Sequence, residues 1–102
     1  MKKAKTMVEI KIDYEGQLRC VAEHMPSGNK VTSDAPVDNQ GRGESFSPTD
    51  MVATALGTCI VTIMGIIADQ REIDLKGLRL IVQKGMSADL PRRIVRLELQ
   101  IH

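Results

Sequence analysis

Cys59 is the residue of this sequence whose type and position could most clearly do chemistry. It lies in a mostly apolar run, 51–68, that follows Ser47 and Pro48. A cysteine in such a setting is either inert packing or a protected nucleophile, because the thiolate is the reactive form and aliphatic surroundings disfavour that charge. From the residues alone, packing is the commoner outcome. A reactive Cys59 therefore requires a cation supplied by another part of the chain.

Arg19 is a candidate for that cation. It alternates with Leu18 and Cys20 along a predicted strand, so we expect it on the opposite face from these two residues. A solvent-exposed arginine without a special role is the alternative, and it is the commoner state of this residue type. Either Glu44 or Asp50 could hold the guanidinium in place.

Asp50 has two possible roles. Near the start of a predicted helix, its carboxylate favours the positive helix end. A catalytic role beside Cys59 is unfavourable within one ideal helix, because nine residues at about 100° each place the two on opposite sides. A catalytic Asp50 therefore requires a second chain or an irregular turn.

Other kinds of site have little support in the residues. The two cysteines and two histidines contain no close pair with the spacing of metal ligands. The glycines around Arg42 form neither a phosphate-binding loop nor a dinucleotide-binding motif. We therefore expect no metal and no cofactor. Cys20 is expected to pack inside its sheet, and a disulfide with Cys59 stays open because it depends on their separation.

Size and composition limit the class of protein. The 102 residues fit one domain, 1–102, and a net charge of +1 with one tyrosine and one phenylalanine argues against a nucleic-acid partner. The basic start, 1–5, leads into alternating residues and not into the apolar block of a signal peptide. The apolar run contains three threonines and follows a helix-capping sequence, so we expect no membrane span. Two cysteines suit the reducing cytoplasm.

The pattern predicts an α+β fold with an antiparallel meander over 6–33, a loop over 34–46, a long buried central helix over 47–70 and further strands over 75–102. The meander is predicted from apolar residues at alternate positions and from turns at Glu15-Gly16 and Ser27-Gly28-Asn29.

The central helix has the clearest start signal. Ser47 suits the N-cap, and Pro48 suits the first helical position because its missing N–H would be unpaired there. Apolar residues on nearly every side indicate a helix enclosed by other structure. One small sheet provides too little surface for that, so we expect a second copy of the chain to cover part of the helix.

The sequence also resembles a known family. Leu18–Glu23, Ser27–Asn29, Ser33-Asp34 and above all Phe46–Cys59, with its Ser-Pro start and Ala-Leu-Gly-Thr-Cys end, resemble the OsmC/Ohr family of osmotically induced and organic-hydroperoxide-resistance proteins. The resemblance is to the OsmC-like branch. It implies an intertwined homodimer with active sites at the interface and thiol-dependent reduction of organic hydroperoxides. It also implies that Cys59 is the peroxidatic cysteine and that Arg19 stabilises its thiolate.

The sequence departs from that family at two points. Thr49 stands where the hydroperoxide-resistance branch has its carboxylate, with Asp50 one place later. The second, resolving cysteine of a later helix has no counterpart before His102, which is expected of a truncated chain, of an external thiol reductant or of lost activity. The alternative function is thus a non-catalytic dimeric domain that binds an apolar small molecule or a protein partner.

Overall fold

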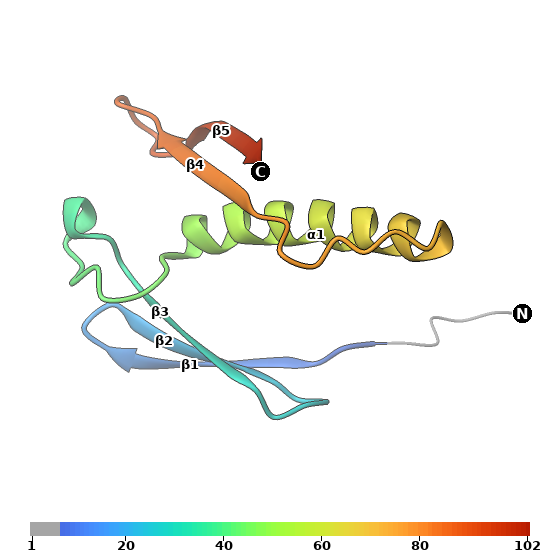
Figure 1. Cartoon of the computed structure of the whole chain (residues 1–102). Helices are drawn as coiled ribbons and strands as arrows, with labels where there is room; N and C mark the ends of the chain where they lie inside the picture. Colours follow the sequence, from blue (N-terminus) through green and yellow to red (C-terminus); the bar gives the residue numbers. More distant parts are fainter. Residues whose placement is uncertain (1–6) are drawn as a thin grey trace, which may run out of the picture. The chain divides into compact units, whose positions relative to one another are not determined.

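The first half of the chain forms a three-stranded antiparallel meander. The computed structural model describes residues 7–102, and its first three strands pair in the order β1 (Ile10–Gly16), β2 (Arg19–His24) and β3 (Lys30–Asp34) (Figure 1). The predicted meander is confirmed, although its first predicted residue, Thr6, lies outside the described part. The chain divides into two units between residues 48 and 49, and each unit is described by itself below.

The turn between β1 and β2 comes two residues later than predicted. Gln17 and Leu18 form it, with φ angles of 54° and 63°, and Gly16 pairs with Arg19 across it. Positive φ at both central residues gives a hairpin turn whose twist matches that of the strands. Leu18 therefore lies in the turn and is exposed, whereas the alternation had placed it on the inner face of the returning strand.

The loop that follows β3 is folded against itself. It begins at Ala35, one residue later than predicted, and contains a short 3-10 helix, η1 (Val37–Asn39). The N–H of Gly43 donates to the carbonyl oxygen of Ala35 over 3.1 Å. A Cβ at Gly41 would lie 1.7 Å from that same oxygen, so only glycine allows this close approach. The loop returns the chain beside the end of the sheet.

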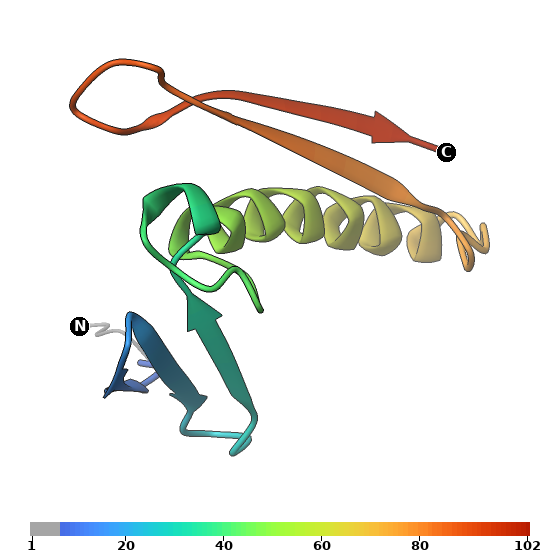
Figure 2. The same cartoon turned by 90° about the vertical axis from the view of Figure 1, so that its left-hand side faces the viewer.

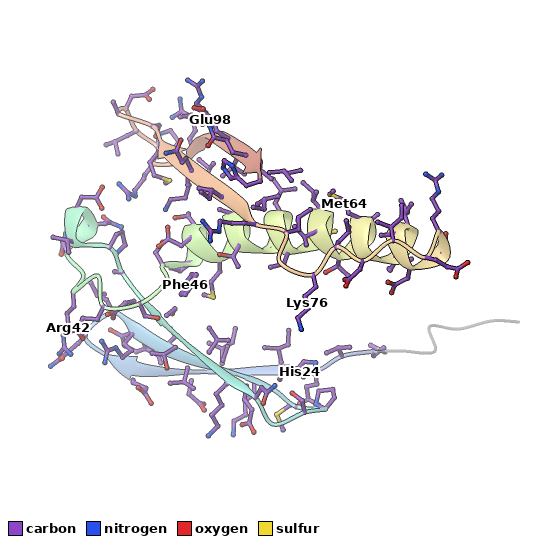
Figure 3. All side chains as sticks on the ribbon, in the orientation of Figure 1. His24, Arg42, Phe46, Met64, Lys76 and Glu98 are labelled. Atoms are coloured by element: carbon purple, nitrogen blue, oxygen red, sulfur yellow. The ribbon has the colours of Figure 1, made fainter. Side chains whose placement is uncertain are left out.

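The second unit contains the central helix and a β-hairpin. Helix α1 (Pro48–Gln70) begins where the Ser-Pro sequence predicts, and the strands β4 (Leu80–Met86) and β5 (Ile94–Ile101) are antiparallel. The hairpin lies along one side of α1 in both Figure 1 and Figure 2. Figure 3 shows Met64 on the side of the helix that faces the hairpin.

Gly57 marks the contact between the helix and β4. A Cβ at this position would lie 2.9 Å from Cγ2 of Val82 and 3.0 Å from Cδ2 of Leu80. The sequence predicts a close approach at Ala53, Ala55 and Gly57, and two of these three residues, Ala53 and Gly57, are buried. The element that approaches Gly57 is β4.

The prediction that the helix is buried is wrong within the second unit. Its buried residues are Ala53, Gly57 and Ala68, and only 17% of its most apolar 18-residue window is buried. The reason is that a two-stranded hairpin covers one side of a helix and leaves the other side open. By length and hydropathy alone, α1 would also be able to cross a membrane. The opposite side, here called the exposed helix face, carries Val52, Leu56, Cys59, Ile63 and Ile66.

The meander also has an uncovered apolar face. Ile10, Ile12 and Tyr14 occupy alternate positions of β1, so their side chains share one side of the sheet, and all three are exposed. The register places Ala22 opposite Ile12 on one side and opposite Val31 on the other. Each unit of the chain therefore has one apolar surface that its own elements leave open.

Candidate functional site

Cys59 lies on the exposed helix face as a free thiol. Cys20 on β2 is also free, so the disulfide that the sequence left open is absent between these two residues. Helical geometry places Leu56 and Ile63 three and four residues away on the same face. Both side chains are exposed, as is Cys59 itself. The elements of the second unit therefore leave the thiol accessible, and it lies among aliphatic side chains.

Arg19 is bound side-on by Asp34, a carboxylate that was not among its predicted partners. Its Cα lies opposite that of Asp34 in the pairing of β2 with β3. Nε donates to Oδ1 of Asp34 over 3.3 Å, and Nη2 donates to Oδ2 over 2.9 Å. The backbone of Asp34 is also fixed, because its N–H donates to the carbonyl oxygen of Phe46 over 2.9 Å. This pair forms the centre of an arginine cluster.

Glu44 completes that cluster, which consists of Arg19, Asp34 and Glu44. Nη2 of Arg19 donates to Oε1 of Glu44 over 2.5 Å, so the prediction that Glu44 could hold Arg19 is confirmed. The backbone N–H of Glu44 donates to Oδ2 of Asp34 over 3.1 Å. The two carboxylates differ in their surroundings: the Asp34 side chain is 0% exposed and that of Glu44 is 60% exposed.

The electrostatics of the cluster are dominated by the Arg19–Asp34 pair. Hydrogen bonds from Arg19 lower the pKa of Asp34 more than its burial raises it, and the N–H of Glu44 lowers it further. The same bonds, to Asp34 first and then to Glu44, raise the pKa of Arg19 above its already high ordinary value. Arg19 and Asp34 therefore form an ion pair near neutral pH. Two carboxylates around one guanidinium give the cluster a net negative charge.

Asp34 was not predicted to pair with Arg19 because its place in a strand depends on the register of β3 against β2. The predicted loop began at residue 34, which made this aspartate a surface residue. In the structure Cys20 faces Ser33 and Arg19 faces Asp34, the last pair of the β2–β3 ladder. Counting back from the turn after His24 would have placed an acidic residue opposite Arg19, and opposite charges in that position favour each other.

Asp50 is paired with a residue of β4. Nζ of Lys84 lies 2.7 Å from Oδ1 of Asp50 and donates to Oγ1 of Thr49 over 2.8 Å. This contact turns Asp50 toward the side of α1 that β4 covers, whereas Cys59 is exposed. The opposite placement expected from the helical repeat is therefore found. A catalytic role of Asp50 stays a prediction.

The three residues predicted to form the site are thus carried by different parts of the chain. Arg19 belongs to the first unit, and Cys59 and Asp50 belong to the second. Across residues 7–102, no group of three or more histidine, cysteine, aspartate or glutamate side chains is arranged to hold a metal ion.

Comparisons with known proteins agree on one family. A family model for OsmC-like protein matches residues 41–102. The fold is similar to the crystal structure of an osmotic stress induced and detoxification response protein from Psychrobacter arcticus 273-4, with a TM-score of 0.88 and 48% sequence identity. That match covers 95% of this chain and 70% of the other. A comparison with curated proteins finds no match. The family model and the similar structure together show that this α+β chain belongs to the OsmC family.

Proposed function

We propose that this protein reduces organic hydroperoxides in the cytoplasm as part of a stress response, with Cys59 as the peroxidatic cysteine. The observation that carries the proposal is a free, exposed thiol on the apolar face of α1, a helix that lies within the residues matched by the OsmC-like family model. The aliphatic side chains beside Cys59 suit the hydrocarbon part of an organic hydroperoxide. The OsmC-like family is generally soluble, which supports a cytoplasmic location.

The proposed reaction transfers one oxygen atom to sulfur. The Cys59 thiolate attacks the terminal oxygen of the hydroperoxide, the O–O bond breaks, and the alkoxide takes up a proton and leaves as the alcohol. Sulfur is oxidised to a sulfenic acid while the peroxide is reduced by two electrons. An external thiol then condenses with the sulfenic acid and releases water, and a second thiol reduces the resulting mixed disulfide.

Arg19 is the proposed source of positive charge for the thiolate. It is a permanent cation, and its guanidinium is held in one orientation by Asp34. A neighbouring cation favours the charged form of a cysteine, which its aliphatic surroundings disfavour. Arg19 and Cys59 belong to separate units, so this role requires the two units, of one chain or of two, to meet.

A homodimer is the proposed assembly. The exposed helix face and the apolar face of the meander are each left open by the elements of their own unit. Contiguous apolar surfaces of this kind are rare on soluble monomers and mark interaction sites. In a two-fold dimer each surface of one chain can be covered by the other chain, which would also restrict access to Cys59.

A second function is favoured by the charge of the arginine cluster. Arg19 is engaged by two carboxylates, so the cluster as a whole does not supply net positive charge. On this alternative the chain is a non-catalytic dimeric domain whose apolar surfaces bind an apolar small molecule or a protein partner. The two functions differ in whether Cys59 is oxidised by a stoichiometric amount of peroxide.

Intact-mass spectrometry of the reduced protein tests this difference. The protein is treated with one equivalent of an organic hydroperoxide, such as cumene hydroperoxide, in the presence of a sulfenic-acid trap. Cys59→Ser and Cys20→Ser are compared, because they are the only two positions with a thiol. The proposal predicts rapid trapping in the parent and in Cys20→Ser, and none in Cys59→Ser. A folded dimer whose Cys59 stays unmodified would support the non-catalytic alternative.

A further inference from the structure

The two carboxylates of the arginine cluster hold Arg19 in unequal ways. Asp34 uses both carboxylate oxygens on the side-on edge of the guanidinium, formed by Nε and Nη2. Its side chain is 0% exposed, and its backbone is fixed both by the β2–β3 pairing and by the bond to Phe46. A buried carboxylate that loses its arginine would be left uncompensated, so this pair is not readily exchanged.

Glu44 makes a contact that is easily released. Within residues 7–102 it accepts a single side-chain hydrogen bond, from Nη2 of Arg19, and its side chain is 60% exposed. Water can replace Arg19 as the partner of an exposed carboxylate at little cost. Glu44 also follows the loop that closes at Gly43, so its side chain can move without a change in the sheet.

The end-on edge of the guanidinium is the part that Asp34 leaves open. This edge consists of Nη1 and the second N–H of Nη2. The hydrogen bonds of Arg19 within residues 7–102 use Nε and Nη2, and Glu44 occupies only the Nη2 half of the end-on edge. A fork of parallel N–H donors is suited to a sulfur anion or to peroxide oxygens.

We propose that Asp34 is the positioning residue of Arg19, and that Glu44 is an exchangeable acceptor which occupies the end-on edge until the reacting group replaces it. Asp34 thus acts through Arg19 and does not itself touch the substrate. This inference rests on the proposed function, because it assigns the end-on edge to the Cys59 thiolate or to the hydroperoxide. Departure of Glu44 would also change the cluster from net negative to neutral.

The direction in which Asp34→Asn changes the reactivity of Cys59 shows whether Asp34 positions Arg19 or only neutralises its charge. If Asp34 only cancelled the charge of Arg19, Asp34→Asn would free that charge and make Cys59 more reactive. If Asp34 positions Arg19, the same substitution disorders the guanidinium and makes Cys59 less reactive. Glu44→Gln removes an equal charge from an exposed position, so it is the matched control for Asp34→Asn.

The experiment measures alkylation of Cys59 by iodoacetamide as a function of pH in a Cys20→Ser background. We expect Arg19→Ala and Asp34→Asn each to slow the reaction at pH 7 by about tenfold, because each should lower the fraction of Cys59 present as thiolate by about that factor. Combining the two should slow it no further, because both remove the same interaction. Glu44→Gln should be about twofold to fivefold faster, in line with release of an exposed ion pair.

A second measurement follows Arg19 without using Cys59. The proton on Nε of Arg19 should exchange slowly in ¹H–¹⁵N spectra of the parent and of Glu44→Gln, and rapidly in Asp34→Asn. Faster alkylation in Asp34→Asn, or an unchanged Nε signal in that variant, would overturn the inference. If Cys59 is unreactive in every variant, the proposed function fails, and the Nε signal alone decides whether Asp34 positions Arg19.

Discussion

Arg19 and Asp34 face each other across β2 and β3, and two hydrogen bonds join their side chains at the end of the sheet. Because the strand register holds both backbones, the pair forms without ordering a flexible segment first. The same pair connects the sheet to the returning loop, since Asp34 also accepts from the N–H of Glu44. The stability of the first unit and the orientation of the candidate cation therefore depend on one carboxylate.

Asp34 should make the first unit sensitive to acid. Its pKa in the folded chain is lowered by Arg19, so its contribution to stability is complete above the ordinary aspartate pKa of about 4. That contribution is lost as pH falls through the lower, folded value. Urea unfolding at pH 7 should show Asp34→Asn to be less stable than the parent, with a much smaller difference near pH 2. Equal differences at both pH values would contradict the assignment.

Gly57 and Gly65 should respond oppositely to alanine. A Cβ at Gly57 meets Val82 at 2.9 Å, whereas a Cβ at Gly65 meets nothing within 4 Å. Alanine favours a helix interior over glycine by about 1 kcal/mol, so Gly65→Ala should raise the free energy of unfolding by that amount. Overpacking should reverse the gain in Gly57→Ala and cost about 1 kcal/mol or more. Thermal unfolding compares them, and equal midpoints would argue against the α1–β4 contact.

Lys84 should stabilise the start of α1 through Asp50. The two side chains are 2.7 Å apart, and Lys84 also binds Thr49. We expect Lys84→Met and Asp50→Asn each to lower the free energy of unfolding by about 1 kcal/mol. The double variant should show a coupling of about 0.5 kcal/mol or more between the two sites in urea denaturation. Additive effects would mean that the pair does not act as a unit.

Local signals in the sequence were sufficient for the main elements. The start of α1 was predicted from Ser47 and Pro48 by helix capping, which acts within one helical turn. In the structure the helix begins at Pro48. The strands of the meander follow from alternation, which is also local. The helix alone singled out Cys59 as either packing or a nucleophile, and its peroxidatic role, which stays a prediction, came from the family resemblance. Glu44 was among the residues expected to hold Arg19.

The remaining features depend on residues far apart in the chain. Asp34 acquires its role only when β3 pairs with β2, and Lys84 only when β4 lies against α1. The turn at Gln17-Leu18 was missed because Glu15-Gly16 has a stronger turn composition. In the structure Gly16 pairs with Arg19, and this pairing leaves Gln17 and Leu18 as the turn residues. The open face of α1 could not be anticipated from an apolar composition, which does not say how many neighbours a helix has.

The exposed helix face should control assembly. Ile63 lies four residues from Cys59 on this face and is 51% exposed, and Ile101 on β5 is 50% exposed but lies elsewhere. If a second chain covers the helix, Ile63→Glu places a charge in an apolar interface and should weaken dimerisation by about a hundredfold or more. Ile101→Glu adds the same charge at equal exposure, so it should leave the association constant within about threefold.

Sedimentation equilibrium across a range of protein concentrations measures both variants. Circular dichroism must first show that Ile63→Glu retains its helix, so that weaker association is not caused by unfolding. A folded monomer in Ile63→Glu beside a dimer in Ile101→Glu would place the partner on the face that carries Cys59. If both variants dimerise like the parent, the exposed helix face is not the interface, and Cys59 would stay open to solvent. An aliphatic surface that stays wet cannot exclude water from a thiolate and its peroxide, so that result would also weaken the enzymatic proposal.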